Sequence, residues 1–183
     1  ARVEYAYWAV QLDSDSGLTV GRTTFEHIAT CAICPGFNRA HAGEVVVSGN
    51  TFIDCDHEGV DSHGGQNLVV KGNRFIDNVV GIIANDGSTI RIEGNFFDGN
   101  QTAISMNNGG NPTIIGNKIV GSTRFGIWLW EDSRASIAGN NIYGNATNIG
   151  LGRSPGDIVA ENNWWGSAEA STIAYFIHDG NDE

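Results

Sequence analysis

Three ionisable side chains, Glu58, Asp61 and His63, lie close together in the sequence. A histidine beside a carboxylate can act as a general base, because the carboxylate holds the imidazole in one tautomer. On a strand that buries Val60, the side chains of Asp61 and His63 point outward together. We therefore expect a candidate catalytic group in which His63 is the base, Asp61 holds its ring or recruits a cation, and Glu58 orients or relays.

A second group places aromatic rings next to amides. Trp128 and Trp130 alternate with Ile127 and Leu129, so both indoles are expected on the outer face of a strand. Flat aromatic faces with polar neighbours suit the apolar faces of sugar rings. The residues that continue this face toward the first group are Asn107, Asn85 and Asp86. The pattern predicts either a track that binds polysaccharide or a surface covered by a neighbouring domain or loop.

Three cysteines, Cys31, Cys34 and Cys55, fall in the first third of the chain. Cys31 and Cys34 have the spacing of a redox or zinc pair, and His27 and His41 flank them as further candidate ligands. The residue before Cys34 belongs to an apolar column, so a strand is expected here rather than a zinc knuckle. A disulfide is the better interpretation, with Cys55 one repeat later and within reach of either partner. Free thiols and a metal site of unknown identity are the alternatives.

The elements that position these residues follow from an internal repeat. A Gly-Asn-X-apolar phrase recurs with a period of about 22 residues, and two further apolar columns keep the same period. In each column, one interval between successive members is longer than the others, which predicts an insertion loop within residues 35–44. The columns are Phe25, Phe52, Phe75, Phe97, Ile119, Ile142 and Trp164; Val10, Ile33, Val60, Ile82, Ile104, Ile127 and Ile149; and Val20, Val47, Val70, Ile92, Ile114, Ile137 and Val159.

Three apolar columns per repeat, with glycine-asparagine turns and no helical period, predict three short strands in each coil. A coil cannot bury its own inward face, so the coils must stack. The predicted fold class is all-β, a parallel β-helix of about seven coils over residues 1–167. Stacking also predicts amide ladders, one at Asn50, Asn73, Asn95, Asn117, Asn140 and Asn162, and a second at Asn78, Asn100 and Asn145, interrupted at Cys55 and Ser122.

Residues 168–183 are expected to form a short capping segment and an acidic tail. Ile173, Phe176 and Ile177 have helical spacing, which predicts a helix over residues 168–178. Trp164 and Trp165 would cover the apolar end of the last coil. The tail, residues 179–183, is a candidate calcium ligand set, although a solvated acidic end is the simpler interpretation. A chain that ends on charge is expected to be part of a longer protein with further domains.

The repeat resembles that of right-handed, single-stranded parallel β-helices in pectate lyases, mannuronan epimerases and many surface proteins, over about residues 5–166. The phrase Asn162-Asn163-Trp164-Trp165-Gly166-Ser167 is similar to a closing phrase of extracellular β-helix proteins. Gly59-Val60-Asp61-Ser62-His63 resembles the Gly-Phe-Asp-Pro-His core of the mannuronan epimerase active site. The resemblance implies that Asp61 and His63 are catalytic and that Asp86 falls near a later acid. Glu58 stands where that family has a tyrosine.

The formal net charge is −11, which argues against a nucleic-acid partner and would repel polyuronates unless calcium intervenes. No apolar run approaches the length of a membrane-spanning helix. The repeat and the cysteines fit an extracellular or cell-surface location. Three functions compete: a polysaccharide-binding module of a larger protein, a polysaccharide lyase or uronate epimerase, and a structural stalk or adhesin segment. A catalytic cleft needs long loops, and only residues 35–44 supply one, so the binding module is favoured.

Overall fold

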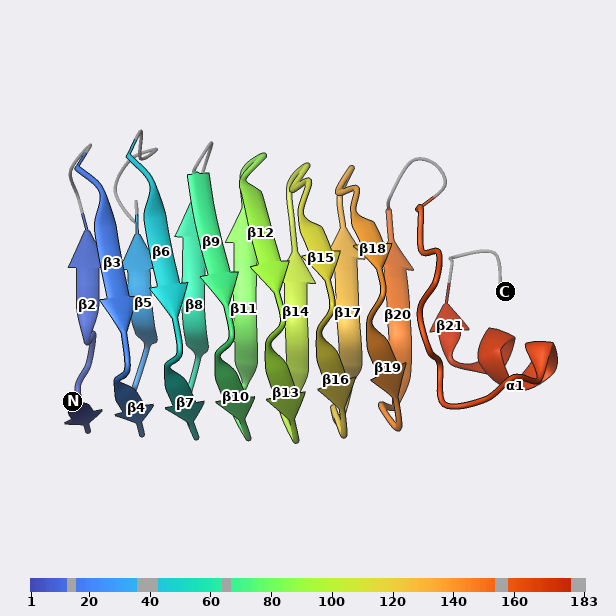
Figure 1. The fold of residues 1–183 in the computed structure, drawn as a ribbon, viewed down its shortest axis with the longest axis horizontal. Coiled ribbons are helices and arrows are strands. Elements are labelled where there is room, and N and C mark those ends of the chain that lie inside the picture. Colours follow the sequence, from blue (N-terminus) through green and yellow to red (C-terminus); the bar gives the residue numbers. More distant parts are fainter. Residues whose placement is uncertain (13–15, 36–42, 64–66, 154–157, 179–183) are drawn as a thin grey trace.

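The computed structural model describes residues 1–12, 16–35, 43–63, 67–153 and 158–178, which form a parallel β-helix (Figure 1). Each complete turn contributes one strand to each of three parallel sheets, which contain seven, eight and six strands. β1 precedes six complete turns, and β20 with two isolated β-bridges continues the stack into a seventh. The all-β parallel β-helix expected from the repeat is therefore confirmed.

The three sheets run along the length of the molecule, and we name them A, B and C. Sheet A contains β1 (Arg2–Glu4), β4 (Thr24–Glu26), β7 (Thr51–Ile53), β10 (Arg74–Ile76), β13 (Phe96–Asp98), β16 (Lys118–Val120) and β19 (Asn141–Tyr143). Sheet B contains β2 (Val10–Leu12), β5 (Cys31–Pro35), β8 (Glu58–His63), β11 (Val80–Asn85), β14 (Thr102–Met106), β17 (Phe125–Trp130), β20 (Thr147–Gly152) and β21 (Ile177–His178). Sheet C contains β3 (Leu18–Gly21), β6 (Val45–Ser48), β9 (Asn67–Lys71), β12 (Thr89–Glu93), β15 (Thr113–Ile115) and β18 (Ser136–Ala138).

The apolar columns of the sequence are also the register of the sheets. Phe25, Phe52, Phe75 and Phe97 are buried and stacked, with adjacent ring centroids 4.6–5.2 Å apart. The column continues through Ile119 and Ile142, and the Ile/Val column of sheet B pairs in the same order from β2 to β20. The five coils between the first and the last therefore bury the same three positions against their neighbours.

A buried amide ladder runs beside the phenylalanine column. Asn95 is a typical rung: its Oδ1 accepts from the backbone N–H of Asn73 at 2.9 Å and from Asn73 Nδ2 at 3.0 Å. Its own Nδ2 donates to the carbonyl oxygen of Val70 at 2.9 Å. The preceding Gly94 turns the chain with a φ of 61°, which glycine adopts without steric cost. A second ladder joins Asn78 to Asn100 and also includes Asn145, Cys55 and Ser122.

The last coil is shifted by one residue from the register expected from the sequence. Asn163, rather than Asn162, is the final rung, because its Oδ1 accepts from Asn140 Nδ2 at 2.9 Å. Asn141 pairs with Trp164, so Trp164 faces outward and is 49% exposed, while Trp165 packs against the core. The expectation that Asn162, Trp164 and Val159 continue their columns is wrong, since one extra residue in this turn moves each side chain to the other face.

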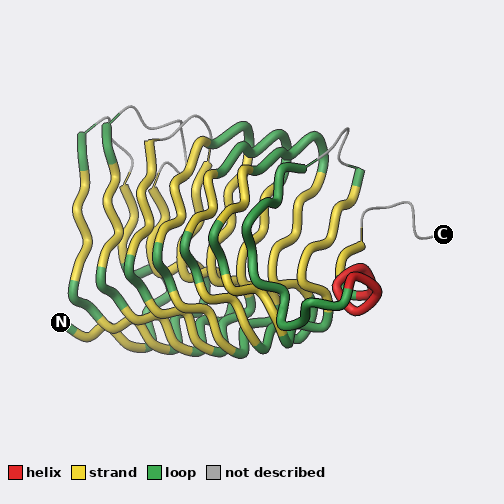
Figure 2. Tube along the Cα trace, turned by 45° about the vertical axis from the view of Figure 1, so that its right-hand side comes forward, coloured by secondary structure: helices red, strands yellow, loops and turns green. Residues whose placement is uncertain are grey.

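The C-terminal segment adds a short helix and then a strand beyond the last coil (Figure 2). The helix α1 spans Ala170–Tyr175, shorter than expected, and buries none of its residues. Ile177 instead lies in β21, where it pairs with Ile149 of β20. The edge of sheet B is therefore protected by hydrogen bonding to β21. The acidic tail that was a candidate calcium site lies outside the described residues.

Replacing Phe75 by alanine is predicted to lower the free energy of unfolding by about 3–5 kcal/mol. Both neighbouring rings are held by their own coils, so the cavity left behind cannot collapse. Urea denaturation monitored by circular dichroism measures the change. Phe96→Ala, on the outer face of β13 in the same sheet, is the matched control and is expected to cost less than about 1.5 kcal/mol. Equal losses in the two variants would contradict the assigned ladder.

Candidate functional site

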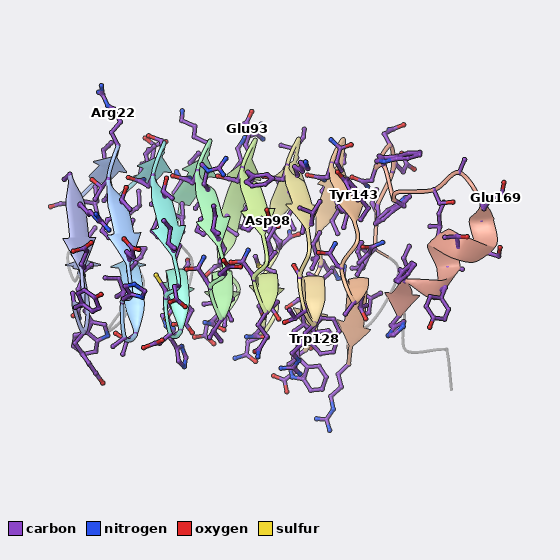
Figure 3. The ribbon with its side chains drawn as sticks, turned by 90° about the horizontal axis from the view of Figure 1, so that it is seen from below. Arg22, Glu93, Asp98, Trp128, Tyr143 and Glu169 are labelled. Atoms are coloured by element: carbon purple, nitrogen blue, oxygen red, sulfur yellow. A yellow bond between two sulfur atoms is a disulfide. The ribbon has the colours of Figure 1, made fainter. Side chains whose placement is uncertain are left out.

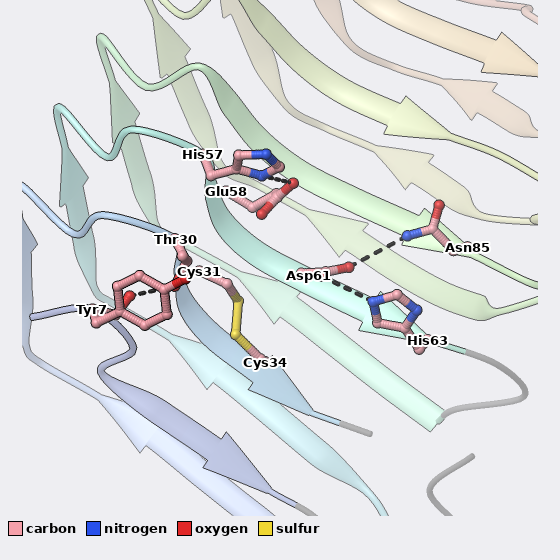
Figure 4. Close-up of a disulfide and its surroundings, with 9 residues drawn as sticks. All are labelled: Tyr7, Thr30, Cys31, Cys34, His57, Glu58, Asp61, His63 and Asn85. Atoms are coloured by element: carbon pink, nitrogen blue, oxygen red, sulfur yellow. Dashed lines mark hydrogen bonds and ion pairs between the residues drawn. A yellow bond between two sulfur atoms is a disulfide. The ribbon is translucent and has the colours of Figure 1, made fainter. Parts of the chain in front are cut away.

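A local bend in the strands of sheet B places residues three apart on the same outer face. In β8, a Cβ built on Gly59 would lie 3.0 Å from the ring of Phe75, so this position faces the core, and the next residue, Val60, is fully buried there as well. Two consecutive inward positions leave Glu58 and Asp61 both on the outer face (Figure 4). The same bend explains how Cys31 and Cys34 in β5 can face each other.

The outer face of sheet B consequently has three parallel columns of side chains, in register from coil to coil. The first contains Cys31, Glu58, Val80, Thr102, Phe125 and Thr147; the second Cys34, Asp61, Ile83, Ser105, Trp128 and Gly150; and the third His63, Asn85, Asn107, Trp130 and Gly152. The outward residues expected from strand alternation are therefore found on this face.

A chain of side-chain hydrogen bonds joins the first candidate group to the second. Asn107 Nδ2 donates to Asn85 Oδ1 at 3.0 Å, and Asn85 Nδ2 lies 3.4 Å from Asp61 Oδ1. The other oxygen of Asp61 is 2.9 Å from His63 Nε2, while His63 Nδ1 lies 3.8 Å from Asp86 Oδ2. Five of the residues singled out in the sequence thus form one polar network across three coils.

Glu58 and Asp61 are more buried than their outward positions suggest, each with 7% of its surface exposed. Burial is the main reason that the pKa of both carboxyl groups is raised above its usual range, and for Glu58 the neighbouring Asp61 adds to the effect. Glu58 bonds to the ring of His57, as Asp61 does to the ring of His63. The face therefore holds two carboxyl–imidazole pairs on one strand.

The tryptophan pair lies on the outer face of β17, as predicted, but its rings lie flat on the next coil. Trp128 and Trp130 stack with centroids 5.5 Å apart, and Phe125 extends the stack at 4.4 Å from Trp128. A Cβ at Gly150 would lie 2.7 Å from the Trp128 ring, so glycine is required beneath it. The indoles are half-buried, and Figure 3 shows Trp128 on the side of the molecule opposite Glu93.

A shallow groove of about 540 Å³ lies beside the indoles, and its lining residues are Asn85, Asn107, Asn108, Trp128, Trp130 and Glu131. A second hollow of about 490 Å³ shares Asn108 and Glu131 and extends to Asp132 and Arg153. Sequence reasoning missed Asn108 and Glu131, which follow the strands in left-handed turns with φ of 53° and 45°. Asn108 and Glu131 occupy equivalent positions in successive repeats, and this alignment is the sequence signal that could have identified them.

A disulfide joins Cys31 and Cys34, while Cys55 is a free, buried thiol. Burial is the main reason that the pKa of Cys55 is raised to about 11, which makes this thiol unreactive at neutral pH. His27 Nδ1 lies 3.0 Å from Asp54 Oδ2, so its ring is engaged by a carboxylate. His41, the other candidate zinc ligand, lies outside the described residues.

The fold and this face define a parallel β-helix protein with an aromatic groove that continues into a polar track on one sheet. The chain belongs to the family described as periplasmic copper-binding protein (NosD), which matches residues 3–181. No curated protein and no solved structure matches the chain. The family supports placement outside the cytoplasm, and no helix in the described ranges is long and apolar enough to cross a membrane.

The described residues do not fit a copper site. Copper in proteins prefers thiolate, thioether and imidazole ligands. The only methionine, Met106, is buried in the core, two of the three cysteines are joined to each other, and the third, Cys55, is buried. In the part of the chain that the structure describes, no group of three or more histidine, cysteine or acidic side chains could hold a metal ion.

The buried carboxyl groups predict how stability changes with pH. Because the pKa of Glu58 and of Asp61 is higher in the folded chain than in the unfolded chain, folding binds protons, and their contribution to stability is lost as pH rises through the folded pKa. The double variant Glu58→Gln with Asp61→Asn should therefore gain stability relative to the parent protein as pH rises from about 4 to 7. Urea denaturation at several pH values measures this difference. Asp98→Asn, at an exposed position, is the control. A stability difference between the double variant and the parent protein that falls as pH rises would contradict the raised pKa of the two carboxyl groups.

Proposed function

We propose that this chain is a β-helix module, placed in the periplasm or at the cell surface, that binds a polysaccharide along the outer face of sheet B. The observation that carries the proposal is the groove in which two stacked indoles lie beside a row of amide side chains. Half-buried indoles held flat by the coil beneath are preorganised, so a sugar ring can stack on them without ordering the protein first.

The amides beside the indoles have hydrogen-bonding capacity left for sugar hydroxyls. Each carboxamide has two N–H donors and two acceptor lone pairs. Asn107 lines the groove and uses one N–H to bond to Asn85. Trp128 lies three coils from Asp61, about 14 Å at the spacing of stacked strands. The track is therefore long enough for several sugar units aligned with the helix axis.

Charge around the groove favours a neutral or cationic polysaccharide. Glu131 lines it, Asp86 and Asp132 lie nearby, and the whole chain has a net charge of −11. Two cations lie at this end: the guanidinium carbon of Arg153 is 5.6 Å from the centroid of the Trp130 ring, and that of Arg124 is 5.6 Å from the centroid of the Phe125 ring. A polyuronate would meet repulsion unless a cation such as calcium screened it. The proposal thus predicts weaker binding of uronate polymers, with calcium reducing the difference.

A polysaccharide lyase or uronate epimerase is the second candidate, favoured by the 2.9 Å contact between His63 Nε2 and Asp61 Oδ2. Such a contact orients an imidazole for proton abstraction. In this reaction His63 would remove the proton next to the sugar carboxylate, and Asp61 would hold its ring. For the lyase, the assay is absorbance at 235 nm with uronate polymers, with and without calcium, because elimination forms an unsaturated sugar, and His63→Ala should abolish any turnover. Turnover in that variant would contradict the assignment.

The binding proposal predicts that the double variant Trp128→Ala with Trp130→Ala loses polysaccharide affinity at least about tenfold, because stacking of a sugar ring needs both flat faces. A glycan array identifies the ligand, and titration calorimetry measures the affinity. Tryptophan fluorescence of the parent protein should shift on binding, and the shift should be absent from the double variant. Trp164→Ala, which removes an exposed indole at the end of sheet A, is the matched control and should bind normally.

A second substitution separates binding from packing, since Trp128 and Trp130 also cover glycines of β20. Trp128→Phe with Trp130→Phe keeps an aromatic cover and should retain the circular dichroism of the parent protein while weakening binding less than the alanine pair does. Unchanged affinity in both pairs would contradict the proposal, as would the absence of binding to every neutral and cationic glycan tested. Those results would favour a surface that contacts another domain of a longer protein, or a structural stalk.

A further inference from the structure

The disulfide between Cys31 and Cys34 lies next to the two buried carboxyl groups of β8 (Figure 4). Cys31 pairs with Glu58, and Ile33 pairs with Val60, which places Cys34 beside Asp61. The neighbouring strand on each side of a parallel sheet lies about 4.8 Å away. Each sulfur-bearing residue therefore has a carboxyl group as its neighbour in the next coil.

The two carboxyl groups are suited to hold protons beside the sulfur atoms. Burial raises the pKa of both, so each remains protonated at a higher pH than an exposed carboxyl group would. Each also contacts an imidazole, Glu58 with His57 and Asp61 with His63, and each imidazole gives its carboxyl group a route for proton exchange with solvent. Across the other edge of β5, the uncharged Gln11 of β2 faces Cys34.

A purely structural role explains this arrangement poorly. The disulfide joins residues three apart, and in the chain-entropy model a short loop gains the least stability from a cross-link. Both cysteines already lie in a hydrogen-bonded strand between two others, so the backbone needs no further constraint. Burying two carboxyl groups in the adjacent coil lowers the stability of the fold. A disulfide with a structural role alone would not need these buried groups beside it.

We infer that Cys31 and Cys34 form a redox centre that is reversibly reduced by a small dithiol, with Asp61 and Glu58 as proton donors to the departing sulfur atoms. Cys31 and Cys34 are only 3% and 2% exposed, so the reductant that the inference requires must be small. The centre lies at the end of the polar track away from the indoles, with Asp61 in β8 three strands from β17.

The reaction balances as a thiol–disulfide exchange. One thiolate of the reductant attacks a sulfur of the disulfide, the S–S bond breaks, and the departing sulfur takes the proton of its neighbouring carboxyl group. The second thiolate of the reductant then attacks the mixed disulfide and releases the other cysteine, which takes the second proton. Two electrons pass from the reductant, which ends as a cyclic disulfide, and the two protons that its thiols lost to solvent restore the carboxyl groups.

The test uses the whole chain in a Cys55→Ser background, which leaves only the pair to be counted. Ser122 occupies the equivalent position of the same ladder, so serine is tolerated there. With dithiothreitol as the reductant, two thiols per chain should appear while the circular dichroism of the folded protein is retained. Removal of the reductant in the presence of oxidised dithiothreitol should restore the disulfide. Thiols that appear only as the protein unfolds would overturn the inference.

The carboxyl groups are tested with Asp61→Asn and Glu58→Gln, since an amide has the same shape and no acidic proton. Reduction should slow about tenfold in each variant. The ratio of parent to variant rate should be greatest at acid pH and fall toward one as the carboxyl groups ionise, which a structural effect would not produce. The charged groups that face the disulfide among the described residues are Glu58, Asp61, His57 and His63, with Asp86 beyond them. In the control variant Asp98→Asn, the disulfide should be reduced at the parent rate. If both test variants keep the parent rate and the parent pH profile, the proton-donor role is overturned.

Discussion

The whole molecule depends on the hydrogen bonds that hold each coil in register with the next. A single coil cannot bury its own inward side chains, so each coil depends on its neighbours. The stack is therefore stable only while equivalent residues remain one strand spacing apart. The asparagine ladder enforces this spacing from inside, because each carboxamide bonds both to the next rung and to the backbone of neighbouring coils. A rung such as Asn95 thereby fixes the backbone, the adjacent phenylalanine stack and, through the strand that follows, the outer face of sheet B.

The same constraint explains why one outer face can hold two chemically different groups in line. The bend at Gly59 repeats in other coils, where two successive positions face the core and the flanking pair faces outward. Cysteines, carboxyl groups and aromatic rings therefore occupy equivalent positions in different coils. The coil in which a residue lies therefore sets its chemistry: the cysteines and the carboxyl groups occupy adjacent coils, and the tryptophans lie three coils further along the axis.

Much of this could be predicted from the sequence, because a repeat fixes both strand positions and register. The phenylalanine column, both amide ladders and the outward direction of Trp128 followed from the period alone. The slip in the last coil could not be found, since Asn162 and Asn163 fit the phrase equally well and only pairing with Asn140 decides between them. The burial of Asp61 depends on side chains in adjacent coils, and the bond from Glu58 to His57 depends on side-chain conformation. The groove includes the turn residues Asn108 and Glu131, which align one repeat apart but lie outside the apolar columns.

The glycines beneath the indoles have a consequence for how this face can evolve. Gly150 and Gly152 leave no side chain on β20 beneath the rings, and any larger residue at either position would occupy the space of the rings. Position 150 is thus tied to position 128, and position 152 to position 130, by volume rather than by charge. A lineage that gains a side chain at one of them must first give up its tryptophan one coil earlier. Across the family, these pairs are therefore expected to change together, and the aromatic patch to be inherited or lost as a unit.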